Sequence, residues 1–383
     1  MHQTRSNNFD ALRLFAALMV IYGHGFNMSG GVGPGLWGVP FARVGLDVFF
    51  AISGYLVTGS WERTPGLWTF LMKRGLRLFP GLLLCTAFGA FVVGPLATTL
   101  PLGDYFRTWN TYKYFANIAL WQRLYLPHVF EELHDPGVVN GSTWSLVPEV
   151  LCYLTVPLLA LMPGLARRWA LVLGGVACGA LGLWLFYGYD GPTVVFYNTD
   201  LKYMLVQVPF FFVGALFRLL EPADGSIYRA DFALLGFTLN WGISSWFGAW
   251  NIPVEWLTLP YMAICFGRMS MPVLRQAARF GDLSYGLYLY AFPVQQLVFH
   301  YRPVDRPHDV WAIPLCVLLS LPLAFLSWHL VEKPALLLKP RANASGRLRA
   351  VDTGVDPRIA AGIVADSTFL AGSAGSATSA RTP

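Results

Sequence analysis

Long apolar runs dominate this sequence and restrict what it can fold into. Of its 383 residues, 55% are hydrophobic and only 13% are charged, whereas soluble domains carry about 25% charged residues. A helix needs about 20 mostly apolar residues to cross a bilayer, and runs of about this length recur along the chain. They lie near residues 11–27, 42–60, 76–99, 143–163, 169–188, 203–220, 231–249, 254–270, 281–300 and 310–330. These runs predict an all-α integral membrane protein with about ten transmembrane helices.

The placement of basic residues predicts the orientation of these helices. An even number of crossings puts both termini on one side, and Lys and Arg are more frequent in the connections on that side. Because cytoplasmic connections carry the excess of basic residues, both termini are predicted to be cytoplasmic. Residues 1–340 form the predicted transmembrane domain, and residues 341–383 form a predicted disordered cytoplasmic tail. In the long outer connection 100–142, the segment 112–121 is too short to span and is predicted to be re-entrant or interfacial.

Composition also excludes some classes of ligand. The net charge of +6 comes from basic residues scattered at predicted helix ends, which membrane topology explains, so we expect no nucleic-acid partner. The five cysteines each lie in an apolar run and show no metal-ligand spacing. We therefore expect reduced, packed cysteines and no metal site.

Ionisable residues inside the first two runs are the strongest functional signal. Arg13 and His24 are eleven residues apart, about three helical turns or 16 Å, so they share one helix face, and Asp10 precedes Arg13 by one turn. Such a residue costs about 2.5–3.5 kcal/mol on insertion scales, so a functional role is the default hypothesis. Asp47 interrupts the second run in the same way and needs a partner, such as Arg43, in a polar cavity.

Two further groups lie at the starts of later runs. Lys73, Arg74 and Arg77 form a basic cluster that either binds phosphates or simply anchors the third helix on the cytoplasmic side. Glu149 lies just inside the fourth run. It is predicted to act as an acid, a base or a hydrogen-bond partner of His24, and a structural ion pair is the alternative.

Taken in order, these residues resemble the motifs of membrane acyltransferase family 3 over roughly residues 8–335. The family patterns are Asp followed by Arg and, after ten residues, His; Gly-x-Asp-x-Phe-Phe-x-x-Ser-Gly; Arg-x-x-Arg; Trp-Ser-Leu-x-x-Glu-x-x-x-Tyr; Ser-Tyr-x-x-Tyr-Leu; and Glu-[Arg/Lys]-Pro. The matching positions are Asp10, Arg13, His24, Gly45, Asp47, Phe49, Phe50, Ser53, Gly54, Arg74, Arg77, Trp144, Ser145, Leu146, Glu149, Tyr153, Ser284, Tyr285, Tyr288, Leu289, Glu332, Lys333 and Pro334. Four positions depart from the residues usual in the family: Pro148, Cys152, Tyr290 and Ala291. The last two stand where family members often have Trp-His, so a role for that histidine cannot be carried over to this chain.

The resemblance implies an O-acyltransferase in the inner membrane of a bacterium. It implies acyl-CoA, with acetyl-CoA as the first choice, as the donor. The implied acceptor is a hydroxyl of a glycan or glycoside, for instance an exopolysaccharide or lipopolysaccharide. A polytopic exporter of a lipid-linked or secreted glycan is the rival prediction, and an inactive assembly subunit is a second one. The sequence leaves open the acceptor, the acyl length and whether the chain forms a homo-oligomer.

The residues suggest how the reaction would proceed. His24 is the candidate general base, because the pKa of an imidazole lies near working pH, and an acyl-histidine intermediate stays open. Glu149 or Asp47 would orient or charge-balance the imidazole. Arg13 lies near the inner face, where Lys73, Arg74 and Arg77 would bind the phosphates of the coenzyme. Candidates for stabilising the oxyanion are Tyr22, Ser53 and Ser145.

Overall fold

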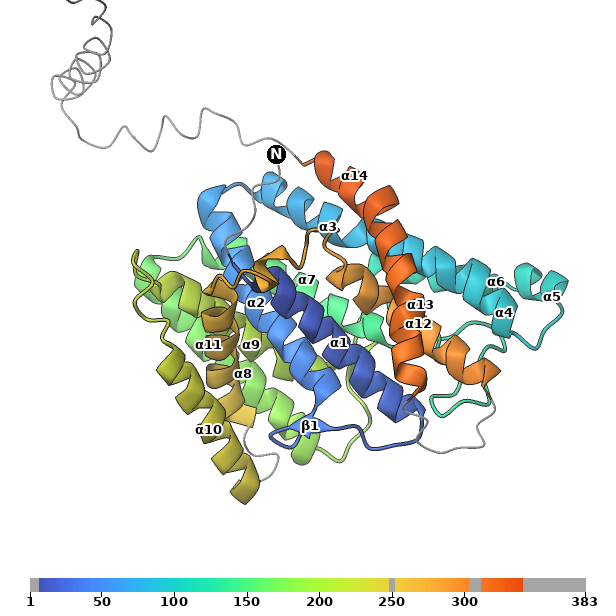
Figure 1. Cartoon of the computed structure of the whole chain (residues 1–383), viewed down its shortest axis with the longest axis horizontal. Coiled ribbons are helices and arrows are strands. Elements are labelled where there is room, and N and C mark those ends of the chain that lie inside the picture. The colour runs from blue at the N-terminus through green and yellow to red at the C-terminus, as the bar shows by residue number, and fades with distance from the viewer. Residues whose placement is uncertain (1–6, 248–251, 303–310, 340–383) are drawn as a thin grey trace, which may run out of the picture. The chain divides into compact units, whose positions relative to one another are not determined.

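The computed structural model describes residues 7–247, 252–302 and 311–339, and the statements below concern these residues. Helices make up most of this part of the chain (Figure 1). The first helices are α1 (Phe9–Met28), α2 (Phe41–Arg63), α3 (Leu67–Phe88), the π-helical η1 (Gly89–Val93), α4 (Gly94–Ala97), α5 (Leu102–Arg107), α6 (Trp109–Lys113), η2 (Tyr114–Ala119), η3 (Ser142–Ser145) and α7 (Leu146–Leu159). They are followed by α8 (Gly164–Tyr187), α9 (Leu201–Leu220), α10 (Ala230–Phe247), α11 (Ile252–Arg268), η5 (Leu274–Gln276), α12 (Ser284–Tyr301), α13 (Ala312–Ser327), the π-helical η6 (Trp328–Glu332) and α14 (Lys333–Leu337). Two short antiparallel hairpins pair β1 (Gly35–Leu36) with β2 (Val39–Pro40) and β3 (Val195–Phe196) with β4 (Thr199–Asp200).

Each predicted apolar run forms a helix in the described part of the chain, which confirms the predicted all-α class. Seven segments are long and apolar enough to cross a membrane: Phe9–Met28, Phe41–Arg63, Leu67–Ala97, Ser142–Leu159, Gly164–Tyr187, Leu201–Leu220 and Ala312–Leu337. The three remaining predicted spans correspond to α10, α11 and α12, which have 17 or 18 residues. The number of crossings and their orientation stay predictions. The predicted tail 341–383 lies outside the described residues.

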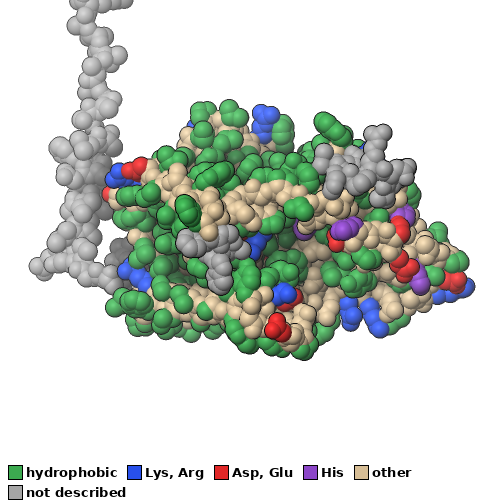
Figure 2. Space-filling view, turned by 90° about the horizontal axis from the view of Figure 1, so that it is seen from below, with side chains coloured by type: hydrophobic (Ala, Val, Ile, Leu, Met, Phe, Trp, Pro, Cys, Tyr) green, Lys and Arg blue, Asp and Glu red, His purple; other side chains and the backbone are tan. Residues whose placement is uncertain are grey.

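The surface of the described part is suited to contact with lipid. Hydrophobic side chains cover much of the face seen in Figure 2, and charged side chains stand there in small groups. On α8, Leu165, Leu173 and Val176 are more than half exposed. Of the most apolar 18-residue stretch of this helix, only 28% is buried inside the protein. An apolar helix with so little protein cover is expected at the lipid-facing edge of a membrane protein.

The helices α2 and α9 approach each other so closely that each needs a glycine at the contact. A Cβ atom on Gly54 would lie 1.9 Å from the carbonyl oxygen of Phe211, and one on Gly214 would lie 2.2 Å from that of Ala51. Small residues allow such backbone approach in membrane helix pairs. Gly54 and Gly214 therefore allow α2 and α9 to lie in direct backbone contact.

Replacing Gly54 with alanine is expected to destabilise the protein by about 1–3 kcal/mol or more, because the new methyl group meets backbone rather than a movable side chain. The measurement is the fraction of protein that stays monodisperse in detergent after stepwise heating. The control is Gly103→Ala, since no atom lies within 4 Å of a Cβ built there. Equal losses in the two variants would contradict the proposed role of the α2–α9 contact.

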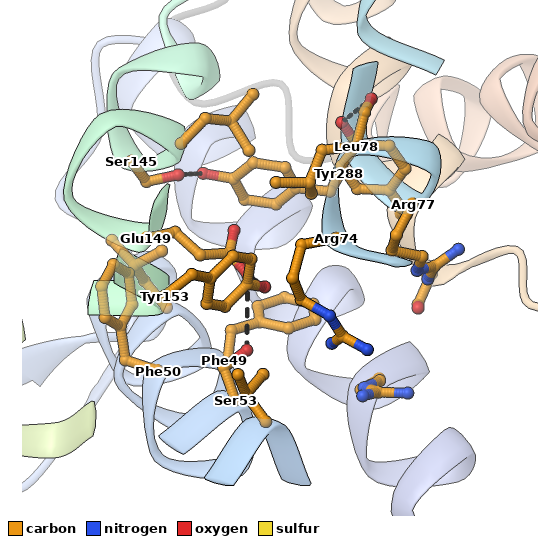
Figure 3. Close-up of a pocket in the computed structure, with 16 residues that line it drawn as sticks. Phe49, Phe50, Ser53, Arg74, Arg77, Leu78, Ser145, Glu149, Tyr153 and Tyr288 are labelled. Carbon is orange, nitrogen blue, oxygen red and sulfur yellow. Dashed lines mark hydrogen bonds between the residues drawn. The ribbon is translucent and has the colours of Figure 1, made fainter. Parts of the chain in front are cut away.

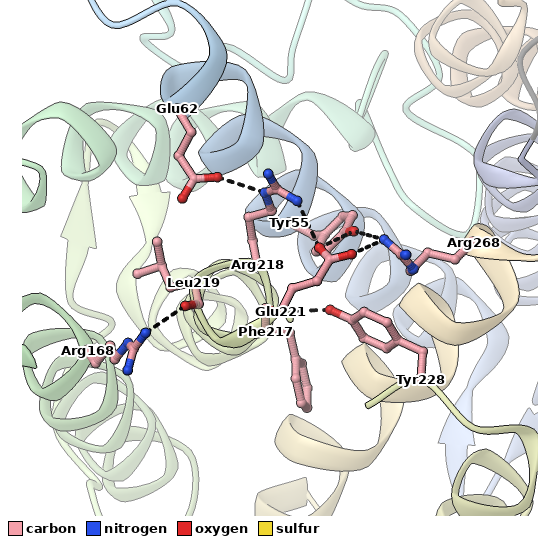
Figure 4. A network of polar contacts seen from close by, with 9 residues as sticks. All are labelled: Tyr55, Glu62, Arg168, Phe217, Arg218, Leu219, Glu221, Tyr228 and Arg268. Atoms are coloured by element: carbon pink, nitrogen blue, oxygen red, sulfur yellow. Dashed lines mark hydrogen bonds and ion pairs between the residues drawn. The ribbon is translucent and has the colours of Figure 1, made fainter. Parts of the chain in front are cut away.

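A network of ion pairs joins α2, the end of α9 and α11 (Figure 4). Glu221 accepts hydrogen bonds from the hydroxyl of Tyr55 at 2.7 Å and from Arg218 at 2.8 Å, and it also pairs with Arg268. Arg218 donates in addition to Glu62 at 2.8 Å. The network thus pairs two guanidinium groups with two carboxylates. These ion pairs hold the ends of the helices together.

The connection 100–142 folds as short helices around a hydrophobic cluster of its own. Tyr105, Tyr114 and Phe130 are buried there, and the hydroxyl of Tyr105 donates to the carbonyl oxygen of Ala90 at 2.8 Å. The predicted re-entrant or interfacial segment 112–121 forms parts of α6 and η2, which are too short to cross a membrane. All five cysteines are free, as predicted.

Candidate active site

A pocket of about 90 Å³ lies among α1, α2, α3, α7 and α12 (Figure 3). Segments that are far apart in the sequence meet at it. It is lined by Arg13, Leu46, Phe49, Phe50, Ser53, Val57, Arg74, Arg77, Leu78, Ser145, Leu146, Glu149, Tyr153, Ser284, Tyr285 and Tyr288. The motifs recognised separately in the sequence therefore contribute to one site.

Arg77 is a cation whose charge is already balanced. Its Nη2 donates to Oδ2 of Asp282 at 2.8 Å, and its Nη1 lies 3.5 Å from Oε2 of Glu332. Glu332 is 1% exposed and also accepts a hydrogen bond from the Ser327 hydroxyl at 2.7 Å, within the π-helical turn η6. Sequence reasoning gave neither Asp282 nor Glu332 a role, although the second matched the closing family motif. The partly exposed Asp282 and the buried Glu332 together explain why position 77 carries an arginine.

Arg74 differs from its neighbours on the pocket wall. Among the described residues, no carboxylate lies within 4.0 Å of its guanidinium, and its buried Nε has no hydrogen-bond partner. Arg13, by contrast, lies 3.5 Å from Asp10 and 3.9 Å from Asp282. The ring of Tyr153 lies 5.9 Å from the Cζ atom of Arg74, within range of a cation–π contact. Arg74 is therefore the pocket cation that is best placed to bind an added anion.

Opposite the arginines, Glu149 holds two hydroxyl groups in place (Figure 3). The hydroxyl of Ser53 on α2 donates to Oε1 of Glu149 at 3.3 Å, and the Tyr153 hydroxyl donates to the same oxygen. Glu149 thus faces the pocket with its hydrogen bonds directed to Ser53 and Tyr153 rather than to His24. The arrangement joins α2 to α7 through one carboxylate.

A second pair of hydroxyl groups forms another part of the pocket wall. Oγ of Ser145 and the hydroxyl of Tyr288 are 2.5 Å apart, and Tyr288 also donates to the carbonyl oxygen of Ser142 at 2.8 Å. The sequence singled out Ser145 as an oxyanion candidate but assigned no role to Tyr288 or Ser284 on α12. Their match to the Ser-Tyr-x-x-Tyr motif was the signal that could have placed them in the site.

His24 lies further along α1 and is not among the residues that line this pocket. Its ring is half-buried and makes an edge-on contact with Phe292 of α12, with ring centroids 5.2 Å apart. The continuous helix α1 separates His24 from Arg13 by about 16 Å along its axis, as the spacing predicted. The imidazole and the arginines are therefore at different depths of the fold.

Three other predicted residues also lie outside the pocket lining. Asp47 is fully buried with Oδ2 4.0 Å from Nε of Arg43, the partner that the sequence suggested. Lys73 donates to the Thr64 hydroxyl at 2.6 Å. Tyr22 is 39% exposed and makes an edge-on contact with the ring of Phe26. The structure thus brings Arg13, Arg74, Arg77 and Glu149 together and places His24, Asp47 and Lys73 elsewhere.

Comparison with known proteins decides the family. The family model of an acyltransferase domain matches residues 6–329. The chain belongs to acyltransferase family 3. With its apolar helices, this makes it a multi-pass member of a family of membrane-bound acyltransferases.

Named relatives of this family member cover most of its length. Nodulation protein 10 of Rhizobium leguminosarum bv. viciae is 31% identical over 362 residues, which cover 87% of this chain and 94% of that protein. The O-acetyl transferase of Shigella phage Sf6 is 29% identical over 338 residues, covering 86% and 96% of the two chains. A peptidoglycan O-acetyltransferase of Listeria monocytogenes is 24% identical over 364 residues, covering 85% of this chain and 55% of that longer protein. No solved structure matches the chain.

Proposed function

We propose that this protein transfers an acyl group, acetyl as the first choice, from acyl-CoA to a hydroxyl of a glycan or glycoside at a bacterial inner membrane. The observation that carries the proposal is Arg74, whose guanidinium has no carboxylate partner among the described residues and lies in a pocket built from the family motifs. Coenzyme A carries phosphate groups, and guanidinium groups bind phosphates through charge-assisted hydrogen bonds. The names of the O-acetyltransferase relatives support the acetyl group, and the peptidoglycan enzyme supports a glycan acceptor.

In this proposal the phosphates of the donor bind at Arg74. Arg13 and Arg77 add positive potential, although their own carboxylate partners balance part of their charge. Lys73, one residue before Arg74, extends the cationic region beyond the pocket wall. Apolar residues such as Phe49 and Leu78 give the pantetheine arm a surface on which to lie. The long arm then carries the thioester along α1 towards His24.

The proposed reaction is acyl transfer with His24 as the general base. The imidazole takes the proton of the acceptor hydroxyl as that oxygen attacks the thioester carbonyl. A C–O bond forms, the C–S bond breaks, and the departing coenzyme thiolate takes up the proton. Glu149, which already orients Ser53 and Tyr153, stays the candidate for positioning the reacting groups. Asp47 stays the candidate for balancing charge on the imidazole.

Replacing Arg74 with alanine is expected to weaken acetyl-CoA binding about 10- to 100-fold. A hydrogen bond to a charged group contributes about 1.5–3 kcal/mol, and about 1.4 kcal/mol corresponds to a factor of ten. Because Arg74 has no carboxylate partner among the described residues, thermal stability should change little. The measurement is equilibrium binding of radiolabelled acetyl-CoA to the purified protein, which requires no knowledge of the acceptor. Arg107→Ala, at an 85% exposed position, serves as the charge-matched control. An unchanged dissociation constant would remove Arg74 from the donor site.

The acceptor is tested in cells. Mass spectrometry should show that surface glycans of a deletion strain lack the mass of an acetyl group and regain it on complementation. An exporter would instead leave the deletion strain without the whole glycan at its surface. Unaltered glycans of full mass would contradict the proposal.

A further inference from the structure

The helix α12 contains a proline, and this residue changes the hydrogen bonding within the helix. Pro293 has no N–H group, so the carbonyl oxygen of Leu289, four residues earlier, cannot accept the usual α-helical hydrogen bond. Leu289 is fully buried, so bulk water does not supply the missing donor. A buried carbonyl group of this kind needs a donor from another part of the chain.

The side chain of Asn140 supplies that donor. Its Nδ2 donates to the carbonyl oxygen of Leu289 at 3.0 Å, and the thiol of Cys85 on α3 donates to the same oxygen at 3.3 Å. Asn140 is 2% exposed, and its Oδ1 accepts hydrogen bonds from the backbone N–H of Ser142 at 3.1 Å and from the Ser142 hydroxyl at 2.7 Å. Because a backbone N–H can only donate, Oδ1 is the amide atom that faces Ser142, and Nδ2 faces α12.

The carbonyl group of Leu289 lies between the two parts of the proposed site. Tyr288, the residue before it, lines the candidate active-site pocket (Figure 3). Phe292, about one turn further along α12, makes the edge-on contact with His24. Four residues of helix span about 6 Å, so one short segment of α12 connects the pocket wall with the candidate base.

Gly141, the residue after Asn140, also contacts this segment of α12. A Cβ atom on Gly141 would lie 2.7 Å from both Cε2 and Cζ of Phe292, so the ring of Phe292 packs directly against the backbone of Gly141. The same ring contacts His24. A shift of residues 140–142 relative to α12 would therefore move the ring that covers the candidate base.

We propose that Asn140 is a positioning residue for the acyl transfer. Its amide replaces the hydrogen bond that Pro293 removes from α12, and it thereby holds Phe292 against His24 at a fixed distance from the pocket wall. This inference rests on the proposed function, because it concerns the alignment of the donor with the candidate base. A misplacement of about 1 Å can lower a reaction rate by about 100-fold.

The variant Asn140→Leu tests the proposal, because leucine has a similar size and shape but no donor group. Transfer of acetyl groups from radiolabelled acetyl-CoA is measured in membranes at increasing donor concentrations. The rate is normalised to the amount of protein that is recovered as monodisperse in detergent. We expect kcat to fall about 10- to 100-fold and the KM for acetyl-CoA to stay unchanged, because Arg74 is intact. A kcat equal to that of the parent protein would overturn the proposal.

Asn117→Leu is the matched control. Asn117 in η2 is 4% exposed, and its Nδ2 donates to the carbonyl oxygens of Tyr114 at 3.0 Å and Arg123 at 2.9 Å. Loss of either buried amide should lower the unfolding temperature, but Asn117→Leu should leave kcat of the folded protein unchanged. Equal falls of kcat in the two variants would contradict a specific role for Asn140.

The addition of Pro293→Ala to Asn140→Leu separates positioning from stability. Alanine restores an N–H that can bond to the carbonyl of Leu289, so the unfolding temperature should rise again. The contact of Asn140 with α12 is still absent, so kcat should stay low, whereas Pro293→Ala alone should keep the parent kcat. Recovery of kcat together with stability would show that Asn140 only satisfies a carbonyl group. That result, no recovery of stability, or a low kcat of Pro293→Ala alone would overturn the proposal.

A second variant covers the case in which Asn140→Leu does not accumulate. Gly141→Ala keeps the amide of Asn140, but its methyl group should displace the ring of Phe292 and lower kcat. An unchanged kcat would contradict the role of this contact. Failure of the proposed function is a different result, because the parent protein itself would then transfer no acetyl groups.

Discussion

Replacing His24 with alanine should lower the rate of acyl transfer by about 10²–10⁴-fold while the protein is still inserted and accumulates. Loss of a general base typically lowers a reaction rate by a factor of this size. The fold should survive, because the ring contact of His24 is with Phe292, and such aromatic pairs contribute only about 0.5–1.5 kcal/mol. The measurement is transfer of radiolabelled acetyl groups in membranes that contain equal amounts of parent and variant protein.

A second histidine provides the control for this experiment. His128 lies in the connection 100–142, pairs with Glu131 at 3.1 Å and is 54% exposed, so His128→Ala should leave the transfer rate unchanged. Binding of acetyl-CoA to His24→Ala should also stay close to that of the parent protein, since the phosphates would contact Arg74. Normal product formation by His24→Ala would end the assignment of the base.

Replacing Arg77 with alanine should have the largest effect on stability, about 3–5 kcal/mol. The change removes the cation beside Glu332, which is 1% exposed, and leaves Asp282 with the more distant Arg13 at 3.9 Å. Thermal unfolding in detergent and the yield of monodisperse protein measure this loss. Arg74→Ala is the matched comparison on the same helix, because no carboxylate among the described residues depends on it.

Removing the negative charges of the two carboxylates should restore much of this stability. The triple variant Arg77→Met, Asp282→Asn and Glu332→Gln contains neither the cation nor the two charges that it balanced. We expect it to unfold close to the parent temperature. If instead Arg77→Ala is as stable as the parent but binds acetyl-CoA weakly, Arg77 is chiefly a phosphate ligand, as the sequence suggested.

The sequence predicted the helices well because hydropathy is a local property. A run such as 203–220 is apolar whatever it packs against, and it forms α9. Hydropathy does not report backbone winding, so the π-helical turns η1 and η6 were not predicted. Hydropathy also cannot show whether α10, α11 and α12 cross the membrane. Burial within the protein and burial in lipid favour the same apolar residues.

The candidate site was only partly predictable, for a different reason. Helical spacing places Arg74 and Arg77 on one face of α3, and both line the pocket. Helical spacing cannot show which of the two arginines has its charge neutralised by a carboxylate. The partner of Arg77 is Asp282, which is 205 residues away in the sequence. The same limit applies to His24: periodicity gives its helix face, but only the packing of α12 beside α1 shows that Phe292 covers it.

The winding of the turn Trp328–Glu332 has a consequence for how this chain tolerates change. A π turn accommodates one more residue than an α turn. Loss of one residue inside the turn would restore ordinary α winding and leave the carboxylate of Glu332 facing Arg77, because the π turn holds its extra residue without rotating the helix that follows. Loss of one residue in the preceding helix α13 would instead rotate that carboxylate by about 100° around the helix axis, away from Arg77. The pairing of Glu332 with Arg77 thus depends on the number of residues in α13 as well as on their side chains, which scanning by point substitution would not detect.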